Sequence, residues 1–284
     1  MRQTLLSFGH GYSARALARR LLPQGWTIYG TTRSPEKALR LEDEGVIPLL
    51  WDEADMTEAF SKASHLLVSA GPGEAGDPVL ARFTPEITRI ASGLDWAGYL
   101  STTGVYGDHQ GGWVSEETPL TPGTARGRAR VDAEAQWGAI PGLPLHIFRL
   151  AGIYGPGRGP FEKVKAGTAR RIIKPNQFFS RIHVDDIAQV LEASIQRPDS
   201  GAVYNVCDDE AAPPQDVIAH AAELLGLPLP PAVAFEEAEL SPMARSFYAE
   251  SKRVDNSRIK RDLGIELIHP DYRAGLAALL RAEG

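Results

Sequence analysis

Cysteine is scarce in this chain, and long apolar runs are missing. Its 284 residues include one cysteine, Cys207, which has no partner within the chain for a disulfide. Such cysteine usage is typical of a reducing compartment, so we expect a cytoplasmic protein. No apolar run reaches the roughly 18 residues of a membrane-spanning helix, and we expect no membrane association. An apolar strand begins at Thr4, which leaves no room for a signal peptide.

Excess positive charge and low-complexity tracts are also missing. The chain has 30 Lys and Arg against 36 Asp and Glu, a formal net charge of -6, and no segment carries a basic stripe. We therefore expect no nucleic acid among its partners. With 43% hydrophobic and 23% charged residues, the composition is that of a globular protein. The length suits a large α/β domain with a smaller partner lobe.

The sequence does have a glycine turn between an apolar strand and an amphipathic helix. The turn follows the pattern G-x-G-x-x-A and consists of Gly9, His10, Gly11, Tyr12, Ser13 and Ala14. The glycines permit a tight turn and close approach of phosphates, Ala14 allows close helix packing, and the helix N-terminus attracts anions. We predict that this turn binds a dinucleotide pyrophosphate. A small-residue turn that serves packing alone is the alternative.

The end of the next predicted strand, 26–31, indicates which dinucleotide binds. NAD-binding proteins carry an acidic residue about 20 positions after the glycines, where this chain reads Thr31, Thr32, Arg33 and Ser34. No carboxylate repels a 2′-phosphate there, and Arg33 offers a planar donor fork beside two hydroxyls. Ser34 and Pro35 also suit a helix start, and both interpretations can hold together. We predict NADP(H) in preference to NAD(H).

Apolar segments alternate with helical ones through the first half of the chain, which predicts an α/β Rossmann-type, doubly wound parallel sheet. The predicted strands are 4–8, 26–31, 46–50, 65–70, 97–101, 145–149 and 203–206. The predicted helices are 12–22, 35–44, 55–63, 78–92, 124–137, 185–196, 213–226, 251–263 and 270–282. Pro48 places its strand at an edge or a strand start. We assign 1–155 and 181–206 to the cofactor domain, and 156–180 and 207–284 to a smaller substrate lobe.

Small and hydroxyl-bearing residues follow several predicted strands. Ala70, Gly71 and Pro72 follow the fourth strand, where small side chains would let a cofactor come close, although they also suit a plain turn. Thr102, Thr103 and Tyr106 follow the fifth strand. Because parallel strands end at one edge of a sheet, we expect these residues at the ligand-binding edge.

Several motifs together make the chain similar to the extended short-chain dehydrogenase/reductase superfamily, the NAD-dependent epimerase/dehydratase group. The motifs are Ser101–Gly107, Arg149–Arg158, Ile182–Ala188, Tyr204–Val206 and Ser251–Val254. The opening G-x-G-x-x-A departs from the usual G-x-x-G-x-x-G and resembles an atypical, YeeZ-like branch.

The resemblance implies that Thr102 polarises a substrate carbonyl. Where the family has its Tyr-x-x-x-Lys pair, this chain has Arg126 and Arg130. Arginine keeps its proton up to a pKa of about 12.5 or above, so Arg126 is a poor acid or base. Arg130 can take over part of the lysine's contact with the nicotinamide ribose. At positions i and i+4 the two arginines share a helix face, either as an anion cradle or as a solvated surface.

The resemblance implies further contacts. Asp52 matches the residue near the adenine, or else belongs to a simple turn, and Ile153 is assigned to the cofactor. Thr103 is assigned to the substrate. Arg158, in the Gly-Pro loop, is assigned to a substrate anion, with solvation on a flexible loop as an equal alternative. Tyr106 is a further catalytic candidate, although packing and loop anchoring is the favoured interpretation. No metal site is predicted.

Two functions follow from these residues. The first is an NADP-dependent oxidoreductase or epimerase-like enzyme acting on a small carbonyl or hydroxyl compound, with an anionic one favoured. The alternative is a non-catalytic NADP(H)-binding sensor or scaffold that has lost the Tyr-Lys pair. The resemblance also implies a homodimer formed through the helices 78–92 and 124–137.

Overall fold

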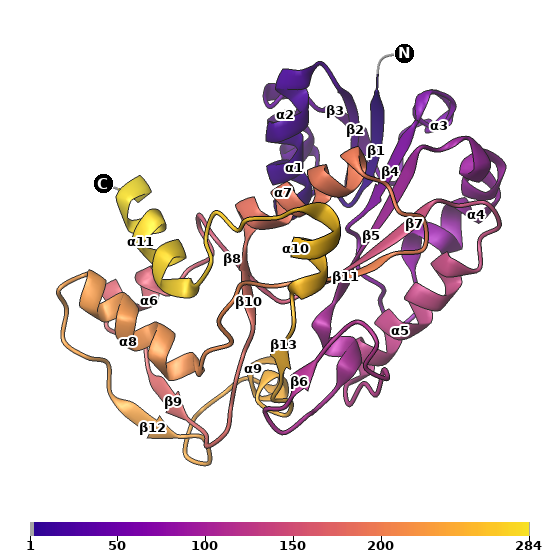
Figure 1. The fold of residues 1–284 in the computed structure, drawn as a ribbon. Coiled ribbons are helices and arrows are strands. Elements are labelled where there is room, and N and C mark those ends of the chain that lie inside the picture. Colours follow the sequence, from indigo (N-terminus) through magenta and orange to yellow (C-terminus); the bar gives the residue numbers. More distant parts are fainter. Residues whose placement is uncertain (1–2, 284) are drawn as a thin grey trace.

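A seven-stranded parallel sheet forms the centre of the molecule (Figure 1). The computed structural model describes residues 3–283. The strand order is β11-β7-β5-β4-β1-β2-β3, and every neighbouring pair is parallel. The strands are β1 Thr4–Phe8, β2 Thr27–Thr32, β3 Ile47–Leu50, β4 His65–Val68, β5 Trp96–Thr102, β7 Leu145–Leu150 and β11 Val203–Val206. This order confirms the predicted doubly wound α/β fold.

Helices cover both faces of the sheet because the strands are apolar on both sides. In β1, Leu5 joins one core cluster while Leu6 and Phe8 join the other, following the two-residue period of a strand. The first cluster packs under α1 Tyr12–Leu21, α2 Pro35–Asp43, α7 Val184–Gln196 and α10 Ser257–Leu263. The second packs under α3 Thr57–Lys62, α4 Pro78–Ile90 and α5 Ala125–Gly138.

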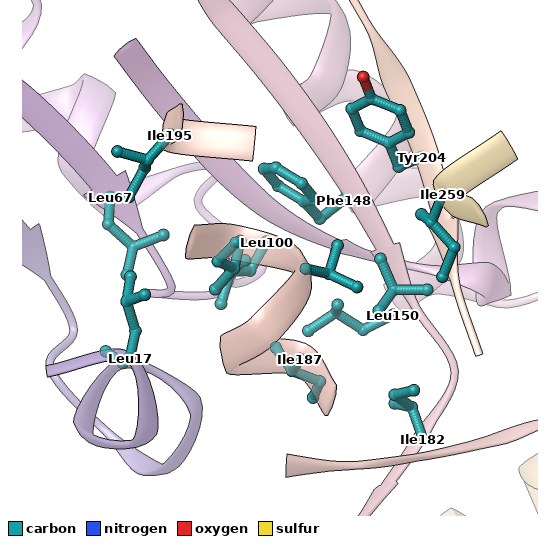
Figure 2. Packing of buried hydrophobic residues seen from close by; sticks show 14 of the residues in the cluster. Leu17, Leu67, Leu100, Phe148, Leu150, Ile182, Ile187, Ile195, Tyr204 and Ile259 are labelled. Atoms are coloured by element: carbon teal, nitrogen blue, oxygen red, sulfur yellow. The ribbon is translucent and has the colours of Figure 1, made fainter. Parts of the chain in front are cut away.

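The first cluster extends beyond the sheet. Figure 2 shows Leu17 of α1, Leu100 of β5 and Ile187 of α7 in one packed layer with Ile182. Ile182 belongs to β10 Arg181–His183, which pairs with β8 Gly152–Tyr154 outside the central sheet. The same apolar layer therefore joins β10 to the sheet.

A third cluster gathers residues from the segments that follow β8. It includes Tyr154, Phe161, Val217 and Leu276, all buried. The elements around it are α6 Phe161–Lys165, α8 Pro214–Leu224 and α11 Tyr272–Glu283. A small sheet of β9 Arg171–Ile173 and β12 Ala232–Ala234 lies beside them, and α9 Pro242–Phe247 follows. Among the described helices, none is long and apolar enough to cross a bilayer.

The predicted strands of the central sheet and the helices that cover it agree with the structure to within a few residues, and β3, which contains Pro48, is one of the two edge strands of this sheet. The helix predicted over 251–263 is wrong in its first half. Residues Arg253–Val254 form β13, which pairs with β6 Trp113–Val114. The Ser251 carbonyl accepts from two backbone N–H groups, those of His109 (3.0 Å) and Gly111 (2.9 Å), so distant partners override the local helical pattern.

We expect Gly98→Ala to destabilise the fold. The Trp96 indole, fully buried between His146 and Phe148, lies over Gly98, and a Cβ there would overlap it. Overpacking of this kind costs about 1–3 kcal/mol. Urea unfolding would measure the loss. Gly138→Ala is the matched control, since a Cβ at Gly138 meets nothing within 4 Å, and equal midpoints for the two variants would contradict this account of β5.

Candidate functional site

The glycine turn is held between the carboxyl ends of β2 and β4. Gly9 has a φ of +70°, and a Cβ there would lie 2.7 Å from the Ala70 backbone nitrogen. The Gly9 N–H donates to Thr31 Oγ1 at 2.8 Å, and the His10 N–H donates to the Thr31 carbonyl at 2.9 Å. A glycine is therefore required where β1 turns between its two neighbours.

The N-terminus of α1 is open. Its N-cap residue, Gly11, provides no side chain, whereas Ser34, Asp77 and Thr124 cap α2, α4 and α5. A Cβ at Gly11 would meet only the Gly9 carbonyl oxygen, at 3.6 Å. The first-turn N–H groups of a helix have no partner within the helix, so this end can receive an anion.

The other turn residues have different environments. Ala14 is fully buried and Ser13 is buried. The His10 ring packs against Gly30, and burial lowers its pKa to about 4, so His10 offers its backbone to the turn rather than a charged ring. Tyr12 reaches away from the turn, and its hydroxyl donates to the Pro156 carbonyl at 2.9 Å.

The end of β2 keeps one exposed cation. Thr32 Oγ1 accepts from the Ser34 N–H at 3.2 Å, and Ser34 caps α2 through the Lys37 N–H at 3.3 Å. Arg33 is exposed, and its side chain forms no hydrogen bond or ion pair with any of the described residues. The Asp52 side chain is 78% exposed after β3 and lies 3.7 Å from Arg82.

Arg130 lies across the carboxyl end of β5. Its Nη1 donates to the Leu100 carbonyl at 2.6 Å and to the Tyr99 hydroxyl at 3.1 Å. Its Nη2 is 2.8 Å from the position of a Cβ on Gly71, so the structure brings Arg130 against the Ala70–Pro72 segment. Among the described residues, no carboxylate is paired with this guanidinium.

Arg126 points elsewhere. It is exposed, and its guanidinium carbon lies 5.8 Å from the centre of the Phe247 ring in α9. The two arginines therefore contact different parts of the molecule. Arg130 contacts the carboxyl end of β5, whereas Arg126 contacts Phe247 of α9.

The turn after β5 is a short helical turn. Thr102 Oγ1 accepts from the Gly104 N–H at 3.2 Å, and Thr102 and Thr103 are both partly exposed. Tyr106, by contrast, is fully buried. Its hydroxyl donates to Asn205 Oδ1 at 2.7 Å and accepts from Arg149 Nη1 at 3.0 Å.

This Tyr106 environment is a structural network. Arg149 is paired with the buried Glu134 at 2.7 Å, and Ser101 also donates to Glu134. Burial raises the pKa of the Tyr106 phenol. The hydroxyl anchors β5, β7 and β11 to one another.

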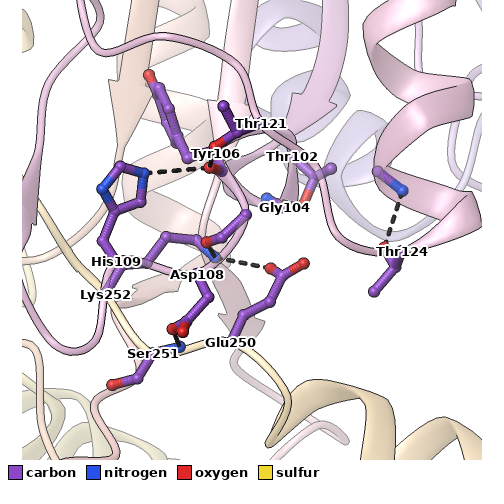
Figure 3. A network of polar contacts seen from close by, with 12 residues as sticks. Thr102, Gly104, Tyr106, Asp108, His109, Thr121, Thr124, Glu250, Ser251 and Lys252 are labelled. Carbon is purple, nitrogen blue, oxygen red and sulfur yellow. Dashed lines mark hydrogen bonds and ion pairs between the residues drawn. The ribbon is translucent and has the colours of Figure 1, made fainter.

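Sequence reasoning gave no role to a second ionisable pair beside this turn (Figure 3). Lys252 is buried, and its Nζ donates to the Gly107 carbonyl at 2.7 Å and to Glu250 Oε2 at 2.8 Å. Glu250 Oε1 is buried without a hydrogen-bond partner, 3.5 Å from the position of a Cβ on Gly123. Lys252 belongs to the tail motif Ser251–Val254, which contributes to the family resemblance, and this motif could have indicated that Lys252 is important.

One buried cluster has the residue types of a metal site, namely His183, Asp186 and His269, with ligand atoms within 4.8 Å. His183 Nδ1 and both Asp186 oxygens have structural partners, whereas His183 Nε2 is buried without a hydrogen-bond partner. His183 Nδ1 accepts from the Asp185 N–H at 3.2 Å, and Asp186 accepts from the Ile268 and His269 N–H groups. A neutral imidazole that accepts at Nδ1 carries its proton at Nε2, which leaves no lone pair there for a metal. The cluster fixes the start of α7 to the C-terminal tail.

Ile153 and Arg158 line one cavity of about 330 Å³ outside the central sheet. The Arg158 guanidinium also lies 4.7 Å from the centre of the Tyr12 ring, next to the glycine turn. Arg158, assigned to the substrate, therefore lies near both Ile153 and the glycine turn, which are assigned to the cofactor.

These features fit a dinucleotide. The open α1 end suits a pyrophosphate, and Gly9 and Gly71 lie where a Cβ would meet Ala70 or Arg130. Arg33 and Arg130 supply cations whose charge no carboxylate among the described residues neutralises.

Comparison with known proteins gives close relatives over the whole chain. No protein-family model matches. Protein YeeZ of Escherichia coli strain K12 is 31% identical over 285 residues, which cover 93% of this chain and 95% of YeeZ. A structure from Silicibacter pomeroyi, described as a functionally unknown conserved protein, is 62% identical with a TM-score of 0.95, and 99% of each chain is covered.

More distant structures share the fold. A putative NAD-dependent epimerase/dehydratase from Methylobacillus flagellatus is 25% identical, with a TM-score of 0.68 over 99% of this chain and 98% of that one. Human epimerase family protein SDR39U1, solved with NADPH, is 17% identical, with a TM-score of 0.76 over 98% and 99% of the two chains. The chain belongs to the YeeZ-like branch of the NAD-dependent epimerase/dehydratase group, within the extended short-chain dehydrogenases/reductases.

Proposed function

We propose that the protein is an NADP(H)-dependent oxidoreductase of the epimerase/dehydratase type that acts on a small, anionic carbonyl or hydroxyl compound. The observation that carries the proposal is the position of Arg130, which lies against Gly71 at the carboxyl end of β5 without a carboxylate partner. The NADPH in the human SDR39U1 structure and the name of the Methylobacillus protein support a nicotinamide cofactor.

Each cofactor contact falls to a different element. The first turn of α1 holds the pyrophosphate by its N–H groups. Arg33, exposed beside Thr32, pairs with the 2′-phosphate. Arg130 takes the position of the family lysine and holds the nicotinamide ribose. When bound, the nicotinamide supplies or accepts a hydride.

Thr102 is the polarising group in this proposal. Its hydroxyl ends β5 at the edge where Arg130 lies, and its proton is free to be donated because Thr102 Oγ1 accepts rather than donates in its own turn. A hydroxyl directed at a carbonyl oxygen stabilises the negative charge that develops there during reduction. Arg126, which lies over Phe247 of α9, moves no proton near neutral pH.

A non-catalytic NADP(H)-binding sensor is the second candidate. One observation favours it: the family tyrosine is replaced by Arg126, and the Tyr106 hydroxyl is already bonded to Asn205 and Arg149. A sensor needs the cofactor residues alone, whereas an enzyme also needs Thr102.

We expect Arg33→Ala to weaken NADPH binding about 10- to 100-fold and to leave NADH binding unchanged, because a charge-assisted contact is worth about 1.5–3 kcal/mol. Titration of each nucleotide, followed by tryptophan fluorescence, measures both affinities. Arg40→Ala, an exposed arginine of α2, the helix that begins just after Arg33, is the matched control. An unchanged NADPH/NADH ratio in Arg33→Ala would refute NADP specificity.

Arg130→Met should weaken both nucleotides about 10- to 100-fold, because the ribose contact is common to NADPH and NADH. Arg130→Lys restores the family residue and should recover most of the affinity. The melting temperature of each nucleotide-free variant shows whether it is folded. Wild-type affinity in folded Arg130→Met would remove Arg130 from the cofactor site.

Thr102→Ala should lower kcat about 10²- to 10³-fold while the dissociation constant of NADPH stays constant, since loss of one donor to a developing oxyanion has this effect. Thr102→Ser keeps the hydroxyl and should retain most of the activity. The assay follows NADPH oxidation with a panel of aldehydes, ketones and 2-oxo acids. Tight NADPH binding without turnover of any of these compounds would favour the sensor.

A further inference from the structure

The cavity of about 330 Å³ lies in the part of the molecule built after β8. Its walls come from β8, β10, α8, α11 and the loop after β8, elements that adjoin one another in Figure 1. Val217 of α8 and Leu276 of α11 make part of the wall apolar. The volume is at the lower end of the range of roughly 300–1,000 Å³ that pockets for small molecules occupy.

A guanidinium without a counter-ion lies in this wall. Arg181 of β10 donates from Nη1 to the carbonyls of Phe179 at 2.8 Å and Ala212 at 3.1 Å. Among the side chains that the structure describes, no carboxylate forms an ion pair with Arg181, whose hydrogen-bond partners are these two carbonyls. Burial lowers the pKa of Arg181, because the positive charge is removed from water without an ion pair.

The two carbonyls do not need this arginine. Phe179 and Ala212 form an antiparallel bridge, in which the Phe179 N–H donates to Ala212 at 3.1 Å and the Ala212 N–H donates to Phe179 at 3.2 Å. Both oxygens are therefore satisfied without Arg181. A buried charge that no structural group requires is expected where a ligand supplies the partner.

Asp208 is the acidic group with the largest effect on Arg181, and it forms no ion pair with it. Burial raises the pKa of Asp208 to about 8, which weakens this carboxyl as a counter-ion. The other groups that act on Arg181 are the phenols of Tyr154, Tyr248 and Tyr272. Burial raises the pKa of all three, and they are uncharged.

Arg158 adds a second guanidinium to the same cavity. It stands on the exposed loop after β8 and lies over the Tyr12 ring, so it joins the cavity to the glycine turn. We propose that this cavity binds the carboxylate or phosphate of a compact ligand with an apolar body, with Arg181 as the fixed cation and Arg158 as the cation at the entrance. The identification of that ligand with the substrate rests on the proposed function, whereas the binding itself does not.

Calorimetric titration of the full chain without nucleotide tests this inference. The probes are phenyl phosphate, benzoate and benzyl alcohol, which share an aromatic body and differ in the polar group. We expect at least one of the two anions to bind at least tenfold more tightly than the alcohol. The stronger of the two identifies the oxyanion as phosphate or carboxylate. Equal binding of the alcohol, or no binding of either anion, would overturn the proposal.

The variants locate the site. Arg181→Met should weaken the preferred anion at least tenfold, with a melting temperature close to that of the wild type, since the Phe179–Ala212 bridge remains. Arg158→Ala lies on an exposed loop and should give a smaller loss. Asp208→Asn should bind the anion as the wild type does at pH 7. Arg170→Met, an exposed arginine that does not line the cavity, is the matched control.

Wild-type affinity in both Arg181→Met and Arg158→Ala would overturn the assignment. If Arg181→Met does not fold, the loss in Arg158→Ala still decides the outcome. NADPH titration of the same variants separates this result from the proposed function. Anion binding without NADPH binding would keep the cavity and reject the oxidoreductase.

Discussion

The close approach of β1 to the segment after β4 is the constraint on which the rest of the site depends. A Cβ on Gly9 would lie 2.7 Å from the Ala70 nitrogen, so the chain passes between β2 and β4 with no room for a side chain. At this point α1 leaves toward one face of the sheet and α4 toward the other. A parallel sheet opens a crevice where its connections diverge in this way. The uncapped end of α1 follows β1, and Arg130 lies against Gly71 just after β4, so the strand order brings both to this edge of the sheet.

Features that depend on local sequence could be predicted without the structure. The β1 turn and α1 follow from glycine spacing and an apolar period, and the edge position of β3 follows from Pro48, which cannot donate to a strand on that side. The segment 251–256 could not be predicted. Its residues favour a helix, but the Ser251 carbonyl is bonded to the backbone at His109 and Gly111, more than 130 positions away in the chain. Lys252 and Arg181 each have one distant partner, the carbonyl of Gly107 for Lys252 and that of Ala212 for Arg181, and the local sequence does not indicate these contacts.

Tyr106 shows why a family pattern alone does not assign a role. Its hydroxyl lies between Asn205 and Arg149, and Arg149 is neutralised by the buried Glu134. Removal of one member of a buried ion pair leaves an uncompensated charge, so such a network is costly to change. The contacts of Tyr106 give it a structural role in holding β5, β7 and β11 together, and this role does not depend on the reaction. Thr102, four residues earlier, is partly exposed and is under no such constraint.

Five arginines of the molecule show two ways in which an oxygen can hold a guanidinium. Arg149, Arg20 and Arg15 are paired with glutamates, and their charge is cancelled within the protein. Arg130 and Arg181 are held by backbone carbonyls, at Leu100 for one and at Phe179 and Ala212 for the other. A carbonyl oxygen fixes the orientation of a guanidinium but leaves its full positive charge, so the field extends to whatever lies beyond it. A fixed and uncancelled cation is what an anionic ligand requires, because the orientation is set before the ligand arrives. Arg181 lines the cavity together with Ile153, and Arg130 lies against Gly71, so each of these two arginines adjoins a segment that the sequence assigns to the cofactor.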